Sequence, residues 1–591
     1  MITQNNATLK NLAILLALNT LALIFILDLP NFDIYMPIHF HSDLDAAVGV
    51  FKMITSGDFP WYLYPHTDTL SQPFGLSFGD YPLPMFLDWV FIRFLGLFIS
   101  DPFAVYNTFI LSSFFFVPLA SYYVLRKFRI DPMIAIVISL LFNYIPYHML
   151  RADHYLYVGY FFIPLWTYYL LLLWNKKPLF FKRKATDNKY AFDLSKKNIF
   201  IMLLLLLSAT WNYYYSFFFV FLIIVSALSA WTYNKNRYML YSSAIMIFLI
   251  IVPVGANMMP YIIHKHQHGK NEAVGQRPVK DSEIYGLKIA QLLLPVDDHR
   301  IKSWSDTKAK YNKGPLNNEN SMATLGVVGS IGFLILLVLI LMRRKNSTLS
   351  RLTILNTSAI MLATIGGLSS LVALLATSQI RGYNRISPFI AFFALLAVAL
   401  LINRFSHKYH MKKVLLYPFL ILLLIFGLYD QSNKEMILSQ KSEDIALVAS
   451  DRDFIRAIEQ NLSNVKEPKI MQYPYISFPE GPYIGKVKHY DQMIGYIYGD
   501  RLKWSYGAVK GRESDRWLSA LVRTEPLKQI AILKSSGFSG IYIDRRGYKD
   551  RAASLEKIFS KLSKNKAMVS GDRTKSFFRI TPTGDMPYVF D

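Results

Sequence analysis

The sequence predicts a polytopic α-helical membrane protein that carries a soluble α/β domain at its C-terminal end. Of its 591 residues, 53% are hydrophobic and only 18% are charged, and the mean hydropathy is +0.26. Apolar stretches of about 20 residues, the length that crosses a bilayer, recur along most of the chain. After Tyr429 the chain becomes charged and soluble in character. This composition excludes an ordinary soluble protein.

The absence of cysteine limits the chemistry that the chain can perform. It excludes a disulfide framework, a thiolate metal site and a cysteine nucleophile. Any reaction must therefore use carboxylates, histidines, arginines or hydroxyl groups.

About eleven segments are long and apolar enough to be transmembrane helices. They cover residues 11–28, 103–125, 132–148, 156–174, 199–212, 214–232, 238–262, 322–342, 352–376, 386–403 and 414–429. The fifth and sixth form one apolar run that is broken at Trp211-Asn212-Tyr213, so we expect a hairpin of two short spans. The first could be a signal peptide, but Leu27-Asp28-Leu29-Pro30 offers no small-residue cleavage site, which favours an anchor.

A further apolar stretch, residues 84–100, carries Asp88 and Arg93. If it were a full span, the basic segment 126–129 would lie outside the cell. We therefore expect an interfacial or re-entrant helix at this position.

The basic residues of the short loops predict the orientation, because positive side chains resist translocation. Five loops are rich in lysine and arginine: 126–131, 175–198, 233–237, 343–351 and 404–413. If these loops are cytoplasmic, they account for most of the net charge of +24, and no nucleic-acid partner is needed.

The same orientation places the large polar regions together on the outside. These are the loops 29–102, 149–155 and 263–321 and the tail 430–591. We therefore expect a membrane domain over residues 1–429, with its main outer loops at 29–102 and 263–321. The tail 430–591 is long enough for an extracytoplasmic α/β domain with its own core. Its pattern predicts a helix from Asp451 to Leu462 and strands over 469–473 and 540–544.

The first outer loop opens with His39, His41, Asp43 and Asp45 at alternate positions. On an extended strand these side chains would share one face, where they could take a proton or hold a divalent cation such as Mg²⁺ or Mn²⁺. Alternatively, Asp43 or the preceding serine could cap a helix over the apolar run that follows. The two roles are compatible, since a capping aspartate is well oriented.

Acids and aromatic residues that lie side by side suggest sugar binding. Asp80 lies beside Tyr81-Pro82, and Tyr213 and Tyr214 lie at the predicted outer end of the hairpin. Aromatic rings stack on sugars while carboxylates accept their hydroxyl groups. Aromatic residues are also enriched at any membrane interface, which is the alternative explanation. His264, His266 and His268 could bind a metal, but no acidic fourth ligand accompanies them.

Two outer turns predict a site for phosphate. The turn after residue 148 contains Arg151, Asp153 and His154, and a second turn contains Arg381 and Arg385. Ionisable groups at the membrane edge are costly unless they face a polar cavity, and arginine forms bidentate bonds to phosphate. A phosphorylated lipid would place its head group at this depth. Snorkelling of the arginines to ordinary headgroups is the alternative.

These residues resemble the pattern of GT-C type glycosyltransferases. The resemblance rests on the Asp43-Leu-Asp45 pair after the first span, on Pro73-Phe-Gly75 and Asp80-Tyr-Pro82, and on the turn from Pro146 to His154. The tail is similar to that of uncharacterised bacterial membrane proteins, through the segments 473–480, 504–512 and 537–545. The resemblance implies a bacterial inner membrane and a donor in which a sugar is linked to polyprenyl phosphate.

We therefore expect a transferase that moves a sugar from this lipid to a glycan, lipid or protein acceptor on the extracytoplasmic face. Asp43, or otherwise Asp45, would accept the proton of the acceptor hydroxyl group. Arg151, Arg381 and Arg385 would neutralise the departing phosphate, with His154 beside it, while Asp80, Asp153, Tyr213 and Tyr214 would contact the substrate. A flippase or transporter for a lipid-linked glycan is the alternative, and a non-catalytic scaffold is a third. The apolar middles of the spans and the lack of paired halves argue against transport.

Overall fold

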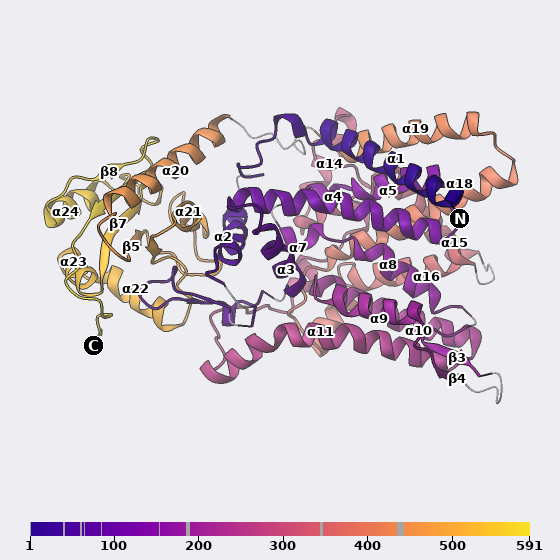
Figure 1. Ribbon diagram of the computed structural model, residues 1–591, viewed down its shortest axis with the longest axis horizontal. Helices are drawn as coiled ribbons and strands as arrows, with labels where there is room; N and C mark the ends of the chain where they lie inside the picture. The colour runs from indigo at the N-terminus through magenta and orange to yellow at the C-terminus, as the bar shows by residue number, and fades with distance from the viewer. Residues whose placement is uncertain are drawn as a thin grey trace. The chain divides into compact units, whose positions relative to one another are not determined.

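The computed structural model is mostly helical (Figure 1). It describes residues 2–38, 42–59, 62–63, 65–83, 85–152, 154–175, 177–184, 190–342, 347–433 and 442–590. The chain divides into two compact units. Unit 1 contains Met1–Phe32, Phe109–Asn257 and Arg277–Ser439, and unit 2 contains Asp33–Thr108, Met258–Gln276 and Gln440–Asp591. Unit 2 thus includes parts of the predicted outer loops as well as the tail, and the predicted domain boundary at residue 430 stays a prediction.

Six helices in the described residues are long and apolar enough to cross a membrane. They are Ala7–Ile26, Pro102–Lys127, Tyr213–Asn234, Tyr238–His268, Tyr383–Lys408 and Lys413–Gln431. Three shorter apolar helices cover Pro132–Asn143, Phe162–Leu172 and Gly326–Leu341. The protein is therefore embedded in a membrane, as the composition predicts. The six long helices coincide with predicted spans, and the total of about eleven spans stays a prediction.

Most of the helices of unit 1 follow the predicted apolar segments. Those that begin before residue 260 are α1 (Ile2–Ile26), α4 (Pro102–Lys127), α5 (Pro132–Asn143), α6 (Pro146–Met149), α7 (Tyr155–Val158), α8 (Phe162–Leu172), α9 (Lys196–Ala209), α10 (Tyr213–Asn234) and α11 (Tyr238–His268). The first residues of α4, up to Thr108, and the last residues of α11, from Met258, belong to unit 2. Those after it are α12 (Asp281–Ile284), α13 (Ile289–Leu293), α14 (Lys302–Asn312), α15 (Gly326–Leu341), α16 (Thr348–Ala363), α17 (Leu368–Leu375), α18 (Ser387–Lys408) and α19 (Lys413–Gln431). The 3₁₀ turns include η3 (Glu319–Ala323) and η4 (Tyr383–Ile386).

Helix α18 is the buried centre of unit 1. It contacts α5, α8, α15 and α16, and every residue from Ser387 to Ala399 is buried. A helix that is apolar on all sides is stable only when other helices cover it. Small residues permit the closest approach, because a Cβ added at Gly332 of α15 would lie 2.3 Å from the carbonyl oxygen of Ala394.

The hairpin break occurs where the sequence predicts it. Helix α9 ends at Ala209, and α10 begins at Tyr213. The side-chain oxygen of Asn212 accepts a hydrogen bond of 3.0 Å from the backbone N–H of Tyr215. This bond satisfies one of the backbone donors that every helix start leaves unpaired.

The described part of unit 2 before the tail consists of short elements. They are α2 (Ser42–Ser56), the paired strands β1 (His66–Thr67) and β2 (Leu76–Ser77), η2 (Phe78–Asp80) and α3 (Phe86–Leu95). Helix α3 has 10 residues. At a rise of about 1.5 Å per residue it is too short to cross a hydrocarbon core of about 30 Å, which agrees with the prediction that 84–100 is not a span.

The tail folds around a five-stranded sheet. The strands are β5 (Lys469–Tyr473), β6 (Lys503–Trp504), β7 (Phe538–Asp544), β8 (Met568–Val569) and β9 (Lys575–Arg579), in the order β6-β5-β7-β9-β8. Strand β5 pairs in parallel with β6 and β7, while β9 is antiparallel to β7 and β8. The helices are α20 (Ser442–Asn461), α21 (Ile494–Tyr498), α22 (Glu513–Arg523), α23 (Pro526–Ser535) and α24 (Ala553–Ser563).

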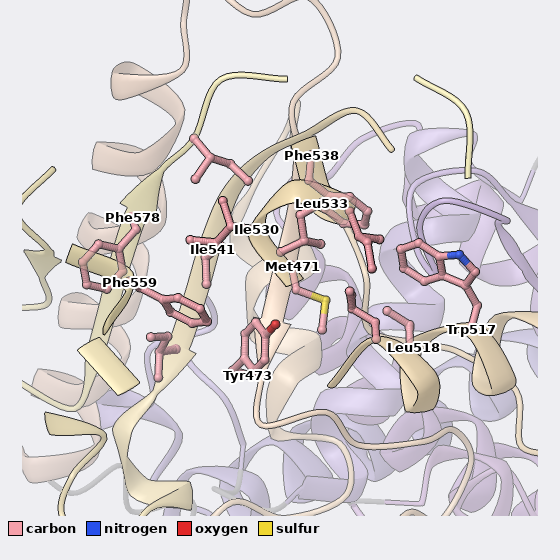
Figure 2. Close-up of a cluster of buried hydrophobic side chains, with 14 of the residues drawn as sticks. Met471, Tyr473, Trp517, Leu518, Ile530, Leu533, Phe538, Ile541, Phe559 and Phe578 are labelled. Atoms are coloured by element: carbon pink, nitrogen blue, oxygen red, sulfur yellow. The ribbon is translucent and has the colours of Figure 1, made fainter. Parts of the chain in front are cut away.

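One face of this sheet holds a hydrophobic core (Figure 2). Met471 and Tyr473 of β5 and Phe538 and Ile541 of β7 pack against side chains of α22, α23 and α24. Every residue of β7 is buried, so both faces of this central strand are covered. The tail thus contributes a hydrophobic core, and its prediction as a separate α/β domain stays a prediction.

Candidate functional site

Two arginines from the predicted outer turns meet inside unit 1. Arg151 follows the short helix α6, and Arg385 lies in η4, immediately before α18. Glu319, the first residue of η3, lies between them. We call Arg151, Glu319 and Arg385, together with Asn384, the arginine cluster.

Glu319 bridges the two guanidinium groups. Arg151 Nη1 donates to Glu319 Oε2 at 2.6 Å, and Arg385 Nη2 lies 3.3 Å from both Glu319 oxygens. Asn384 completes the cluster, because its Nδ2 donates to Glu319 Oε1 at 3.2 Å and its Oδ1 lies 3.4 Å from Arg151 Nη2. The two predicted turns are therefore joined through one carboxylate.

Tyrosine rings surround the guanidinium groups. The Arg385 guanidinium carbon lies 4.2 Å from the ring centroid of Tyr157 and 4.6 Å from that of Tyr214. Arg151 lies 5.5 Å from the Tyr147 ring and 5.7 Å from the Tyr157 ring. Aromatic faces attract cations, so these rings stabilise the charges and fix the orientation of the guanidinium planes.

Backbone geometry makes room for Arg385. A Cβ added at Gly382 would lie 2.6 Å from Arg385 Nε, so a larger residue there would displace the guanidinium group. Proline at the start of α18 sets the helix direction immediately after η4.

The arginine cluster is buried and carries more positive than negative charge. Arg151 is 1% exposed and Arg385 is 9% exposed. Within the described residues, the Nε atom of each arginine has no hydrogen-bond partner. Burial alone would raise the pKa of Glu319, but Arg385 and Arg151 hold that pKa below its usual range. Glu319 is thus ionised, and two guanidinium charges face a single carboxylate.

Arg381 lies near the arginine cluster with a carboxylate of its own. Its Nη1 lies 3.3 Å from Asp281 Oδ2, and its guanidinium carbon lies 4.8 Å from the Tyr285 ring centroid. The backbone carbonyl of Tyr285 accepts a hydrogen bond of 2.9 Å from Asn384. All three arginines of the predicted phosphate site are therefore linked in unit 1.

The remaining predicted residues of these turns are placed as follows. Tyr214 is buried beneath Arg385, and its ring lies 4.8 Å from that of Tyr213. The His154 ring lies 6.2 Å from the Tyr157 ring, and its backbone N–H donates to the carbonyl of Arg151 at 2.9 Å. Asp153 lies outside the described residues.

The sequence reasoning identified the arginines but missed their carboxylate partners. Glu319 and Asp281 lie in the long loop 263–321, in which we singled out only the three histidines. The available signal was position, because Glu319 immediately precedes a predicted span and so lies near the depth of Arg151. Asn384 was missed because amides carry no charge signal.

In unit 2, the predicted catalytic aspartate pairs with a histidine of the tail. Asp43 lies in the first turn of α2, and its Oδ1 is 3.1 Å from His489 Nε2. Both side chains are partly exposed, His489 to 20% and Asp43 to 30%. We did not single out His489 in the sequence, and nothing local to it marks this pairing.

Asp45 lies in the same turn of α2 but in different surroundings. Burial of its carboxyl group raises its pKa well above the usual range, and the neighbouring charges of Asp491 and Asp451 raise it further. Arg546 and Lys488 oppose this effect. Asp45 therefore keeps its proton to a higher pH than an ordinary aspartate does.

Asp43 and Asp45 lie in the first turn of helix α2, not on the extended strand that would have placed them on one face, because positions two apart on a helix do not face each other. In the part of the chain that the structure describes, no group of three or more histidine, aspartate or glutamate side chains could hold a metal ion. His39 and His41 lie outside the described residues. Asp43 and Asp45 as ligands of Mg²⁺ or Mn²⁺ stay a prediction.

Asp80 forms an ion pair inside unit 2. Its carboxylate accepts two hydrogen bonds of 2.6 Å from Arg512 and one of 3.1 Å from Asn271. Burial alone would raise its pKa, but the bonds from Arg512 and Asn271 lower it. Its side chain is 7% exposed, so these contacts give Asp80 a structural role, while the predicted sugar contact stays a prediction.

A family model identifies the family to which the chain belongs. The model, described as a domain of unknown function (DUF6311), matches residues 83–387, which is more than half of the chain. The chain belongs to the DUF6311 family. The matched region contains Arg151, Glu319 and Arg385, whereas Asp43 and His489 lie outside it. No curated protein matches the chain.

Solved structures offer distant likenesses to this DUF6311 protein. The arabinofuranosyltransferase AftD from Mycobacteria matches with 12% identity and a TM-score of 0.39, over 85% of this chain and 35% of AftD. The oligosaccharyltransferase AglB from Archaeoglobus fulgidus, in complex with an inhibitory peptide and a dolichol-phosphate, matches with 11% identity and a TM-score of 0.43, over 98% of this chain and 75% of AglB. The chain thus spans about a third of the length of AftD. Likeness at this level carries no argument about fold or activity.

Proposed function

We propose that this DUF6311 protein is a membrane glycosyltransferase of GT-C type. It would move a sugar from a polyprenyl-phosphate-linked donor to a glycan, lipid or protein acceptor on the extracytoplasmic face of a bacterial inner membrane. The proposal takes its donor and its fold type from the sequence resemblance. The observation that carries it is the arginine cluster.

The arginine cluster suits a lipid phosphate in charge and in position. Planar guanidinium groups bind phosphate oxygens in a bidentate manner, and buried ones do so without competition from water. Arg385 lies two residues inside a candidate span that begins at Tyr383. A lipid phosphate bound to its guanidinium group would therefore lie near the membrane edge, where lipid head groups lie. A phosphate there would meet guanidinium groups that Glu319 and the tyrosine rings already hold in place.

Asp43 and the three arginines have different roles in the proposed transfer step. The Asp43 carboxylate accepts the proton of the acceptor hydroxyl group as that oxygen forms a bond to the anomeric carbon. The bond from the anomeric carbon to the phosphate oxygen breaks, and its electron pair stays on the phosphate. Arg151, Arg381 and Arg385 stabilise the charge that develops there. Tyr213, Tyr214, Asp80 and Asp153 are proposed sugar contacts, and His154 a further phosphate contact.

The test uses the full chain in lipid vesicles, supplied with polyprenyl-phosphate hexoses and pentoses and with cell-envelope extracts as acceptors. Release of polyprenyl phosphate and labelling of the acceptor are measured. We expect wild-type protein to release the carrier and Asp43→Asn to abolish release, with donor binding retained.

The matched control is Asp68→Asn. Asp68 also contacts a histidine, His66, elsewhere in unit 2, and the change removes its carboxylate. It should keep wild-type rates. Full activity of Asp43→Asn would leave Asp43 without a catalytic role. Movement of intact donor across the bilayer without release would instead support the flippase.

A further inference from the structure

Asp43 pairs with His489 of the tail, a residue outside the region that the family model matches. We propose that His489 is a positioning residue that holds the Asp43 carboxylate for proton transfer. This inference rests on the proposed function, because it assigns His489 to the same reaction.

His489 and Asp43 are in direct contact. His489 Nε2 and Asp43 Oδ1 are 3.1 Å apart, a hydrogen-bond distance. A hydrogen bond to one carboxylate oxygen fixes the orientation of the whole carboxylate. Hydrogen bonds from neighbouring residues commonly hold catalytic acids and bases in their productive geometry in this way. Because both side chains keep part of their surface exposed, a substrate hydroxyl group can reach the pair.

The ring of His489 is itself held in place by its neighbours. Its centroid lies 4.3 Å from that of Tyr490, at an interplanar angle of 76°, and 5.2 Å from that of Tyr483. The backbone carbonyl of His489 accepts a hydrogen bond of 2.6 Å from the Tyr506 hydroxyl group. A residue fixed by two rings and a backbone bond can position another with little loss of entropy.

The two aspartates of α2 lie in different surroundings. Burial and the charges of Asp491 and Asp451 raise the pKa of Asp45, so its carboxyl group keeps a proton to higher pH and is less available as the charged acceptor that this step requires. A hydrogen bond donated to a carboxylate favours its charged form, which is the form a base requires. His489 donates such a bond to Asp43 when its proton is on Nε2 or when the ring is charged.

The proton balance of the step is simple. The acceptor O–H bond breaks and its proton goes to the Asp43 carboxylate, while the oxygen bonds to the anomeric carbon and the carrier phosphate leaves with the electron pair. His489 changes no covalent bond in this step. Its contribution is the orientation of the carboxylate, so its loss should slow the reaction without weakening donor binding.

The experiment compares His489→Leu, which removes the donor, with His489→Gln, which keeps an N–H at a similar reach. His489→Leu should lower kcat about 10- to 100-fold at unchanged KM for the polyprenyl-phosphate sugar. His489→Gln should recover to within about threefold of wild type.

The matched control is His66→Leu, since His66 Nε2 also contacts a carboxylate, that of Asp68, at 2.8 Å. It should leave kcat unchanged. If His489→Leu fails to fold, His489→Asn replaces it. The asparagine side chain is too short to reach Asp43, so kcat should fall by the same factor as was expected for His489→Leu.

Each remaining outcome counts against the inference. If Asp43→Asn abolishes transfer but His489→Leu behaves like His66→Leu, the role of His489 is wrong and the proposed function stands. If His489→Leu abolishes transfer while Asp43→Asn keeps it, the roles are reversed and the inference is wrong. If wild-type protein transfers no sugar from any donor, both the inference and the proposed function are wrong.

Discussion

Glu319 sets the charge of the arginine cluster. It is the only carboxylate that contacts both Arg151 and Arg385 among the described residues. Without it, two buried guanidinium groups would face each other with no counter-charge. Breaking a buried ion pair by removing one partner typically costs about 3–5 kcal/mol. A side chain that was not singled out in the sequence therefore makes the predicted phosphate site stable in the folded chain.

Replacing Glu319 by glutamine should change how stability depends on pH. Because the folded protein lowers the pKa of Glu319, its contribution is fully present above the unfolded pKa of about 4.3 and is lost as pH falls through the folded pKa. We expect Glu319→Gln to lower Tm at pH 7, and we expect the difference from wild type to shrink below about pH 4. Thermal unfolding in detergent from pH 3 to pH 8 measures this.

The control for that series is Glu272→Gln, which removes an exposed carboxylate paired with Lys270. Exposed pairs contribute about 0–1 kcal/mol, so its Tm should follow wild type throughout. Parallel curves for wild type and Glu319→Gln at every pH would show that Glu319 does not neutralise the arginines.

Replacing Arg385 by lysine keeps the charge but removes the planar fork. Lysine cannot contact Glu319 and a phosphate with paired N–H groups in the way a guanidinium does. We expect Arg385→Lys to raise the Kd for undecaprenyl phosphate about tenfold, which corresponds to about 1.4 kcal/mol. Binding to protein in vesicles can be followed by native mass spectrometry.

Arg300→Lys is the matched control, because Arg300 lies 5.4 Å from the Tyr429 ring centroid and donates to Ser432 in the same unit. It should bind undecaprenyl phosphate with wild-type affinity. An equal loss of affinity in both variants would indicate a general effect of arginine replacement.

At the scale of elements, close helix packing depends on individual glycines. A Cβ at Gly332 would clash with the backbone of α18, which cannot move without disturbing its buried contacts. We expect Gly332→Ala to destabilise the protein by about 1–3 kcal/mol, the usual cost of overpacking. In contrast, Gly255 in α11 has no atom within 4 Å of an added Cβ. Gly255→Ala should keep or raise Tm, since alanine favours a helix by about 1 kcal/mol; equal losses in both variants would contradict the packing argument.

The sequence predicted elements best where an apolar run is long and uninterrupted. All six long candidate spans lie within or around such runs. The predicted segment 352–376 is instead divided into α16 and α17, with Gly366 between them at a φ of +73°. The predicted segment 132–148 ends early, at Asn143, because the residue before Pro146 is disfavoured in a helix. Hydropathy averages over such breaks, and only local backbone preferences mark them.

Tertiary contacts limited what could be predicted of the site. Arg151, Arg381 and Arg385 were recognisable because basic residues are unusual on the predicted outer side. The contacts of Arg151 and Arg385 with Glu319 depend on three segments that are distant in the sequence but close in the fold. The hydrophobic periodicity of a sequence does not predict such contacts. The pairing of Asp43 with His489 is of the same kind, because the two residues lie 446 positions apart.

At the scale of the whole molecule, the natural absence of cysteine makes the predicted orientation directly testable. A single introduced cysteine would be the only thiol in the chain. Lys557 in α24 of the tail and Lys182 in β3 (Phe181–Arg183) are both exposed. The excess of lysine and arginine in loop 175–198 predicts that Lys182 is cytoplasmic and that the tail is extracytoplasmic.

A membrane-impermeant maleimide should therefore label Lys557→Cys in intact spheroplasts and label Lys182→Cys only after permeabilisation. The cysteine-free wild-type chain is the control for background labelling. The reverse pattern would place the outer turns, and with them the arginine cluster, at the cytoplasmic surface. A polyprenyl-phosphate sugar presented outside could not then reach the guanidinium groups, so this result would exclude extracytoplasmic transfer even if phosphate binding at Arg385 were intact.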